Sequence, residues 1–160
     1  MIAAIFAAAP GARFKAIRDE TPPPALASLA QKLSDFEGIE PAELPSDLRA
    51  QLRPYQVDGI NWLSFLRGLG MGALLADDMG LGKTLQALCV VDGRTLVVAP
   101  TSVLQNWRKE AETFRPDLSV SIYHGPKRSL DDDAELVLTT YAILRLDRKV
   151  LAQQDWKMVV

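Results

Sequence analysis

The first part of the chain differs in pattern from the rest. Apolar residues recur at three- and four-residue spacing over residues 25–36, which predicts an amphipathic helix. Three consecutive prolines precede this helix and two more soon follow it, as is typical of a linker. We therefore divide the chain into an N-terminal extension and linker over residues 1–44 and a domain over residues 45–160.

Beyond the linker, short apolar runs alternate with segments of helical periodicity. Helical patterns cover residues 54–69, 83–91, 102–114 and 142–152. Runs of the length of a strand cover residues 72–76, 95–99, 120–123, 136–139 and 157–160. Strands that alternate with helices are joined by right-handed crossovers, which produce a parallel sheet. The pattern therefore predicts an α/β fold.

The last predicted strand coincides with the end of the chain. A compact domain seldom ends on an apolar strand without a polar tail. We therefore expect an incomplete lobe, a piece of a longer protein, over the alternative of a natural C-terminal edge strand.

Composition excludes several kinds of chemistry. Of the 160 residues 48% are hydrophobic and 24% are charged, the balance of a globular domain. A single cysteine excludes a disulfide scaffold and a cysteine-based zinc site. Because the chain has one histidine, a nucleophilic triad would have only one candidate base. No uncharged stretch approaches the ~18 residues of a membrane-spanning helix. We expect no membrane partner and a cytoplasmic location.

Net charge carries no general signal for nucleic acid. The 18 basic and 20 acidic residues give a net charge of −2. Any contact with phosphates must therefore come from a local patch.

Residues 77–84 form the most specific motif, between a predicted strand and a predicted helix. They are Asp77, Asp78, Met79, Gly80, Leu81, Gly82, Lys83 and Thr84. The glycines permit a backbone path that points N–H groups at an anion, the lysine supplies a charge for phosphates, and the threonine hydroxyl can join a magnesium shell. The general pattern G-x-x-x-x-G-K-[ST] has glycine where Asp77 stands. The alternative is a glycine turn that closes a strand.

A glutamine 27 positions before the motif lysine supports nucleotide binding. The Gln56 side chain offers one donor and one acceptor, which matches the edge of adenine. The alternative is an ordinary surface glutamine on a helix, but its pairing with the phosphate-loop motif favours ATP.

Four segments together resemble the Swi/Snf-type ATPases of helicase superfamily two, in particular their bacterial members. They are residues 52–62, the phosphate loop D-D-M-G-L-G-K-T-L-Q, the segment L-V-V-A-P-T-S-V-L-Q-N-W and the segment V-L-T-T-Y-A-I-L. The resemblance covers about residues 45–160, and residues 25–36 resemble the tail of a preceding region. It implies a partial first RecA-like lobe of an ATP hydrolase that moves along double-stranded DNA through sequence-independent backbone contacts. A DNA-bound protein target and, in a bacterium, association with the nucleoid are further expectations.

The resemblance also implies roles for single residues. Gln56 would bind adenine, residues 77–84 would bind the phosphates of ATP, and Lys83 and Thr84 would be the catalytic residues, the latter through Mg²⁺. DNA would be contacted by two sets of residues at strand ends, namely Pro100, Thr101 and Ser102, and Thr139, Thr140 and Tyr141. The alternative for both sets is strand-end and helix-cap chemistry, which favours Ser and Thr.

The family's Asp-Glu motif and second lobe would follow the last residue. We therefore expect this chain alone to bind ATP weakly and to hydrolyse hardly any. Two alternatives stay open, a truncated, non-catalytic nucleotide-binding module and an unrelated phosphate-loop kinase. Stimulation of ATP turnover by duplex DNA separates the translocase from the kinase.

Overall fold

The structure is a computed structural model and describes residues 38–160. The predicted helix over residues 25–36 lies outside the described residues. The elements in chain order are α3 (Pro54–Gly68), α4 (Lys83–Cys89), β1 (Thr95–Val98), α5 (Thr101–Phe114), β2 (Val120–Ile122), β3 (Leu136–Thr139), α6 (Tyr141–Leu146), α7 (Arg148–Leu151) and β4 (Met158–Val159).

The four described strands form one parallel sheet. Their order is β2-β3-β1-β4, and every neighbouring pair is parallel. In the central pair Thr95 lies opposite Leu136 and Val98 lies opposite Thr139. The predicted α/β fold is confirmed, because the sheet is parallel and helices connect β1 to β2 and β3 to β4, while a loop without a helix connects β2 to β3.

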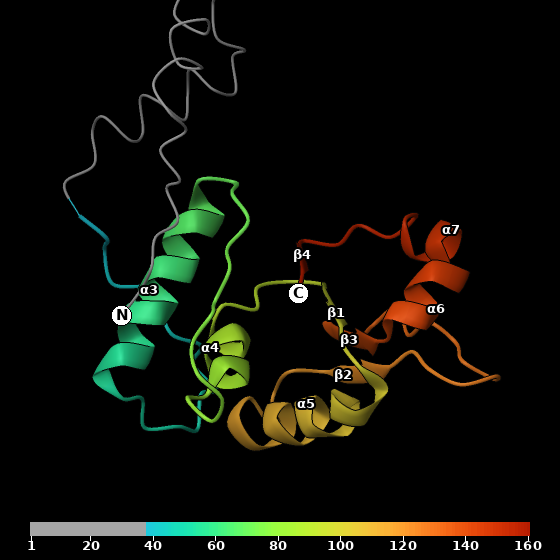
Figure 1. Cartoon of the computed structure of the whole chain (residues 1–160), viewed down its shortest axis with the longest axis horizontal. Helices are drawn as coiled ribbons and strands as arrows, with labels where there is room; N and C mark the ends of the chain where they lie inside the picture. The colour runs from blue at the N-terminus through green and yellow to red at the C-terminus, as the bar shows by residue number, and fades with distance from the viewer. Residues whose placement is uncertain (1–37) are drawn as a thin grey trace, which may run out of the picture.

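Helices cover both faces of the sheet (Figure 1). On one face α4 and α5 pack against the strands through a buried cluster that includes Leu88, Leu104 and Leu138. On the other face α6 and α7 contribute Ile143 and Leu151 to a second cluster. Burial of these apolar side chains on both faces is what holds a parallel sheet together.

A third buried cluster joins α3 to α4. Its centre is Ile60 of α3, with Leu85 and Cys89 of α4. Cys89 is a small residue of this core, and burial raises the pKa of its thiol to about 11. Because α3 packs directly on α4, the first turn of α3 lies against the loop that precedes α4.

A buried ion pair fixes the segment that enters the domain. Arg115, which follows α5, donates from Nε to Asp47 at 2.6 Å and from a terminal nitrogen to the Leu88 carbonyl at 2.7 Å. The backbone N–H of Asp117 also donates to the Asp47 carboxylate, at 3.2 Å. Arg115 thereby joins the segment that precedes α3 to the end of α5 and to α4.

Two predicted elements differ from the structure. Residues 72–76 form neither a helix nor a strand, because no described strand pairs with this segment. Figure 1 draws this segment as a plain trace between α3 and α4. The predicted helix over residues 142–152 is divided into α6 and α7 at Asp147, whose carboxylate is bound by Tyr123 and Arg128.

Within residues 38–160, no helix has the length and apolar composition that crossing a membrane requires.

Candidate functional site

The phosphate-loop motif forms a turn that leads directly into α4. Gly80 and Gly82 both have left-handed backbone conformations, with φ of 83° and 77°. Gly82 is the residue that precedes the first turn of α4, and its carbonyl accepts from the N–H of Gln86 at 3.0 Å. Only glycine adopts this conformation without strain, so both glycines are needed for the path of the loop.

The motif lysine lies inside its own loop. The ammonium of Lys83 donates to the carbonyl oxygens of Asp77 at 2.7 Å and Asp78 at 2.8 Å. Thr84, the next residue, is half-buried at the start of the helix. The ammonium therefore already occupies the centre of the turn, where a phosphate could replace the two carbonyl contacts.

The loop is open to solvent at its tip. Met79 is 96% exposed, and nothing lies within 4 Å of the position where Gly80 would carry a Cβ. An ammonium, a hydroxyl and an open glycine turn are a donor set that fits the triphosphate of a nucleotide. Among residues 38–160, no group of three or more His, Cys, Asp or Glu side chains could hold a metal ion.

Gln56 lies next to this loop rather than on the surface. Its side chain is buried on the first turn of α3, where Oε1 accepts from the backbone N–H of Arg53 at 3.0 Å. Its Nε2 donates to the carbonyl of Leu81 in the phosphate loop at 3.1 Å. The predicted adenine ligand is therefore a direct contact of the loop, and one N–H and one lone pair of its amide form no hydrogen bond with the described residues.

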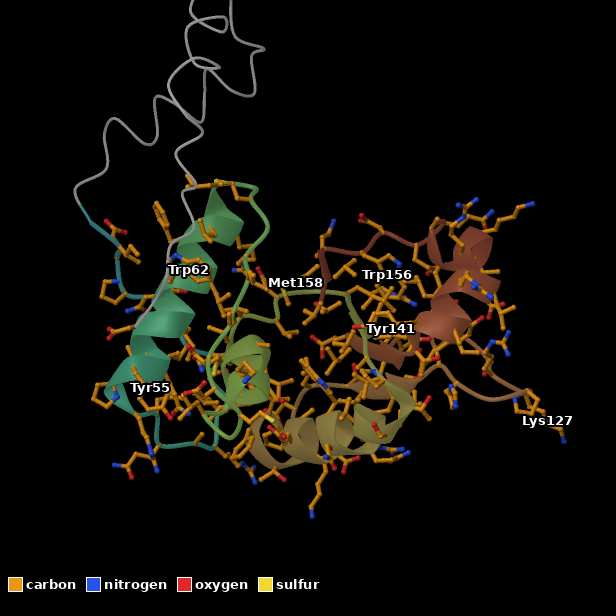
Figure 2. The ribbon with its side chains drawn as sticks, in the orientation of Figure 1. Tyr55, Trp62, Lys127, Tyr141, Trp156 and Met158 are labelled. Atoms are coloured by element: carbon orange, nitrogen blue, oxygen red, sulfur yellow. The ribbon has the colours of Figure 1, made fainter. Side chains whose placement is uncertain are left out.

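Tyr55 is a contact of the loop that the sequence analysis missed. Its hydroxyl donates to the same Leu81 carbonyl at 3.3 Å. Figure 2 shows Tyr55 at the end of α3 that carries the first turn. Its position directly before Gln56 was the only signal available in the sequence.

Gln86 is a second residue to which no role was given. Its side chain is fully buried on α4, and Nε2 donates to a carboxylate oxygen of Asp77 at 3.4 Å. Its Oε1 is buried without a hydrogen-bond partner in the part of the chain that the structure describes. Such an unsatisfied amide oxygen costs about 1–3 kcal/mol, a cost that calls for an explanation.

The two sets of predicted DNA residues lie at one edge of the sheet. Because β1 and β3 are parallel neighbours, their carboxyl ends meet, and the N–H of Ala99 donates to the Thr139 carbonyl at 2.9 Å. Pro100, Thr101 and Ser102 are exposed at the start of α5. Tyr141 is 63% exposed at the start of α6, where Figure 2 shows it beside the sheet.

Thr139 and Thr140 do not present their hydroxyls at this edge. Thr139 is fully buried and its Oγ1 donates to the Tyr123 carbonyl at 2.9 Å. Thr140 is 3% exposed and its Oγ1 accepts from the N–H of Ile143 at 3.3 Å, which caps α6. Strand-end and cap chemistry therefore accounts for these two hydroxyls. The exposed side chains at the edge are those of Pro100, Thr101, Ser102 and Tyr141.

The chain is similar to proteins of the SNF2 family. Residues 55–160 match the family described as SNF2-related domain. A Bacillus subtilis protein, YwqA, named as a candidate ATP-dependent helicase/translocase, is 43% identical over 150 residues, which cover 84% of this chain and 16% of that protein. The TATA-binding protein-associated factor MOT1 of Saccharomyces cerevisiae is 33% identical over 156 residues, 81% of this chain and 8% of that protein.

A solved structure shares the fold. The Sulfolobus solfataricus SWI2/SNF2 ATPase core in complex with dsDNA aligns with a TM-score of 0.69 and 40% sequence identity, over 75% of this chain and 27% of that chain. The chain thus spans only a small part of the length of these proteins. A family match over most of the chain and a relative at 43% identity show that the chain belongs to the SNF2-related domain family, as part of the SWI2/SNF2 ATPase core.

Proposed function

We propose that this chain is the ATP-binding part of an ATP-dependent, helicase-like DNA translocase that remodels protein–DNA complexes. The observation that carries the proposal is the position of Lys83, whose ammonium lies inside a glycine turn that leads into a helix. This turn places a fixed positive charge and backbone groups where a triphosphate can bind.

Each residue of the site has a proposed task. Lys83 exchanges the carbonyl oxygens of Asp77 and Asp78 for the β- and γ-phosphates of ATP, and Thr84 contributes its hydroxyl to Mg²⁺ held by the same phosphates. Gln56 binds the adenine edge with its free N–H and lone pair while it keeps its contact with Leu81. Base and phosphates are thereby held by residues that contact each other.

The exposed edge formed by Pro100, Thr101, Ser102 and Tyr141 is the proposed contact with double-stranded DNA. Hydroxyls and backbone N–H groups at the start of α5 suit phosphate oxygens, which position a duplex without reading its sequence. The presence of duplex DNA in the similar SWI2/SNF2 ATPase core supports this assignment. The buried Thr139 and Thr140 stabilise this edge through their hydrogen bonds to the backbone of Tyr123 and Ile143. A DNA-bound protein target and a cytoplasmic location remain expectations.

ATP binding by the 160-residue chain is the first test. We expect a fluorescent ATP analogue to bind in the presence of Mg²⁺, and Lys83→Ala to weaken binding at least tenfold because the charge at the centre of the turn is lost. The matched control is Lys109→Ala, which removes an exposed lysine of α5 that forms no ion pair within the described residues. Equal affinity of the two variants would contradict the proposal.

Duplex DNA provides the second arm of the same experiment. Fluorescence anisotropy of a labelled duplex should show salt-dependent binding by the chain that does not depend on sequence. A chain that binds ATP but does not bind duplex DNA would instead favour the alternative of a non-catalytic nucleotide-binding module. Little hydrolysis is expected from this chain alone.

A further inference from the structure

The first position of the phosphate loop raises an electrostatic problem. In the general phosphate-binding pattern this position is glycine, which has no side chain, whereas here it is Asp77. A carboxylate close to a bound triphosphate repels it, and the repulsion is strong where water is partly excluded. A working loop therefore needs a place for this carboxylate that is away from the phosphates.

Gln86 provides such a place. Its Nε2 donates to Asp77 Oδ2 at 3.4 Å, while Lys83 holds the carbonyl of the same aspartate at 2.7 Å. The backbone of Asp77 thus contacts the lysine of the loop, and its carboxylate contacts a fully buried side chain of α4.

The position of Gln86 depends on a glycine of α3. A Cβ added to Gly59 would collide with Oε1 of Gln86, so any larger residue there would displace the amide. Oε1 of Gln86 thus lies close against Gly59 of α3, and it has no hydrogen-bond partner among the described residues. The orientation that points Nε2 of Gln86 at Asp77 therefore leaves Oε1 of the same amide without a hydrogen bond.

We propose that Gln86 is a positioning residue that holds the Asp77 carboxylate away from the phosphate site, and that Gly59 provides the space for it. The inference rests on the proposed ATP-binding function. Gln86 is fully buried and would act on the bound phosphates only through Asp77.

The test is nucleotide affinity of the full 160-residue chain with Gln86→Met, which keeps the length of the side chain and removes its donor. The freed carboxylate should weaken binding of ATP about fivefold but leave binding of adenosine, which carries no phosphate, within about twofold. The loss should shrink as salt is raised from 50 mM to about 500 mM, because screening weakens repulsion between charges. Circular dichroism and the thermal unfolding midpoint report whether the variant folds.

Two further variants separate electrostatics from packing. Asp77→Asn combined with Gln86→Met should recover most of the lost ATP affinity relative to Gln86→Met, because the repelling charge is gone. Gly59→Ala should reproduce the ATP-specific loss with Gln86 still present, and it serves as the test if Gln86→Met does not fold. An equal loss for adenosine and ATP, or a loss unaffected by salt, would show a merely structural role and overturn the inference.

The outcomes distinguish the inference from the function on which it rests. Wild-type chain that does not bind ATP would overturn the proposed function and the inference with it. Wild-type binding that Gln86→Met leaves unchanged would overturn the inference alone.

Discussion

At the scale of single residues, the candidate site is a small set of polar contacts around one loop. The sequence predicted the glycines, Lys83 and Gln56 because their types and spacing suit a nucleotide. It could not show that Gln56 contacts the Leu81 carbonyl, since that contact requires the fold of α3 onto α4. The roles of these residues in ATP binding stay predictions until binding is measured.

The two glycines of the loop allow a matched measurement at this scale. Gly80→Ala and Gly82→Ala should each cost about 1–2 kcal/mol of unfolding free energy, because both positions have a left-handed backbone. Gly82→Ala should cost about 1 kcal/mol more, since its Cβ would lie 2.5 Å from Nε2 of Gln56 and break the hydrogen bond to Leu81. Urea unfolding of the two variants measures the difference, and equal costs would show that the Gln56 contact contributes nothing.

At the scale of elements, helices and strands with a clear period were predicted well, and their ends to within a few residues. The exceptions are decided by contacts over long range. Asp147 ends α6 and begins α7 while Tyr123 and Arg128 bind its carboxylate, and no local pattern announces this contact. The helix expected at residues 25–36 and the domain boundary near residue 45 stay predictions.

The Asp47–Arg115 pair should make stability depend on pH. Burial raises the pKa of the Asp47 carboxyl, but the hydrogen bond and charge of Arg115 and the N–H of Asp117 outweigh this effect and hold the pKa below its usual value. The stabilisation is therefore complete above the unfolded-state pKa of about 4 and is lost as pH falls through the lower folded-state pKa.

Asp47→Asn should remove this stabilisation at neutral pH. The expected cost is about 3 kcal/mol, because the buried guanidinium of Arg115 loses its charged partner. The control is Glu112→Gln in the exposed Arg108–Glu112 pair of α5, with an expected cost below about 1 kcal/mol. Urea unfolding at pH 7 and pH 3 measures both, and a wild-type advantage over Asp47→Asn that persists undiminished at pH 3 would contradict the assignment.

At the scale of the whole molecule, the packing of α3 on α4 positions the phosphate loop, and the parallel sheet positions the predicted DNA edge. The phosphate loop lies between the first turn of α3 and α4, and the predicted DNA edge lies at the carboxyl ends of β1 and β3. The prediction of a strand over residues 72–76 is wrong for a reason that belongs to this scale. A strand forms only where a neighbouring strand pairs with its backbone, and no described strand pairs with this segment. Leu74, at the middle of that segment, is 73% exposed.

Hydrogen exchange of the 160-residue chain tests this arrangement. Backbone amides of residues 72–76 should exchange at the earliest time points, because no ladder protects them within the described residues. Amides of β1 and β3 should be the slowest, since these strands lie at the centre of the sheet and are buried. Protection of residues 72–76 equal to that of β3 would show that the segment is paired in solution.

The sequence alone determined the α/β class, the family resemblance and the position of the phosphate loop, because periodicity and motif spacing are local properties of a chain. Only the tertiary structure decided which polar groups face one another, among them Gln86 and Asp77, and which threonines at the sheet edge are buried. It also decided that residues 72–76 remain unpaired. These features depend on packing between segments that are distant in the sequence, and hydrophobic pattern and motif spacing do not encode that packing.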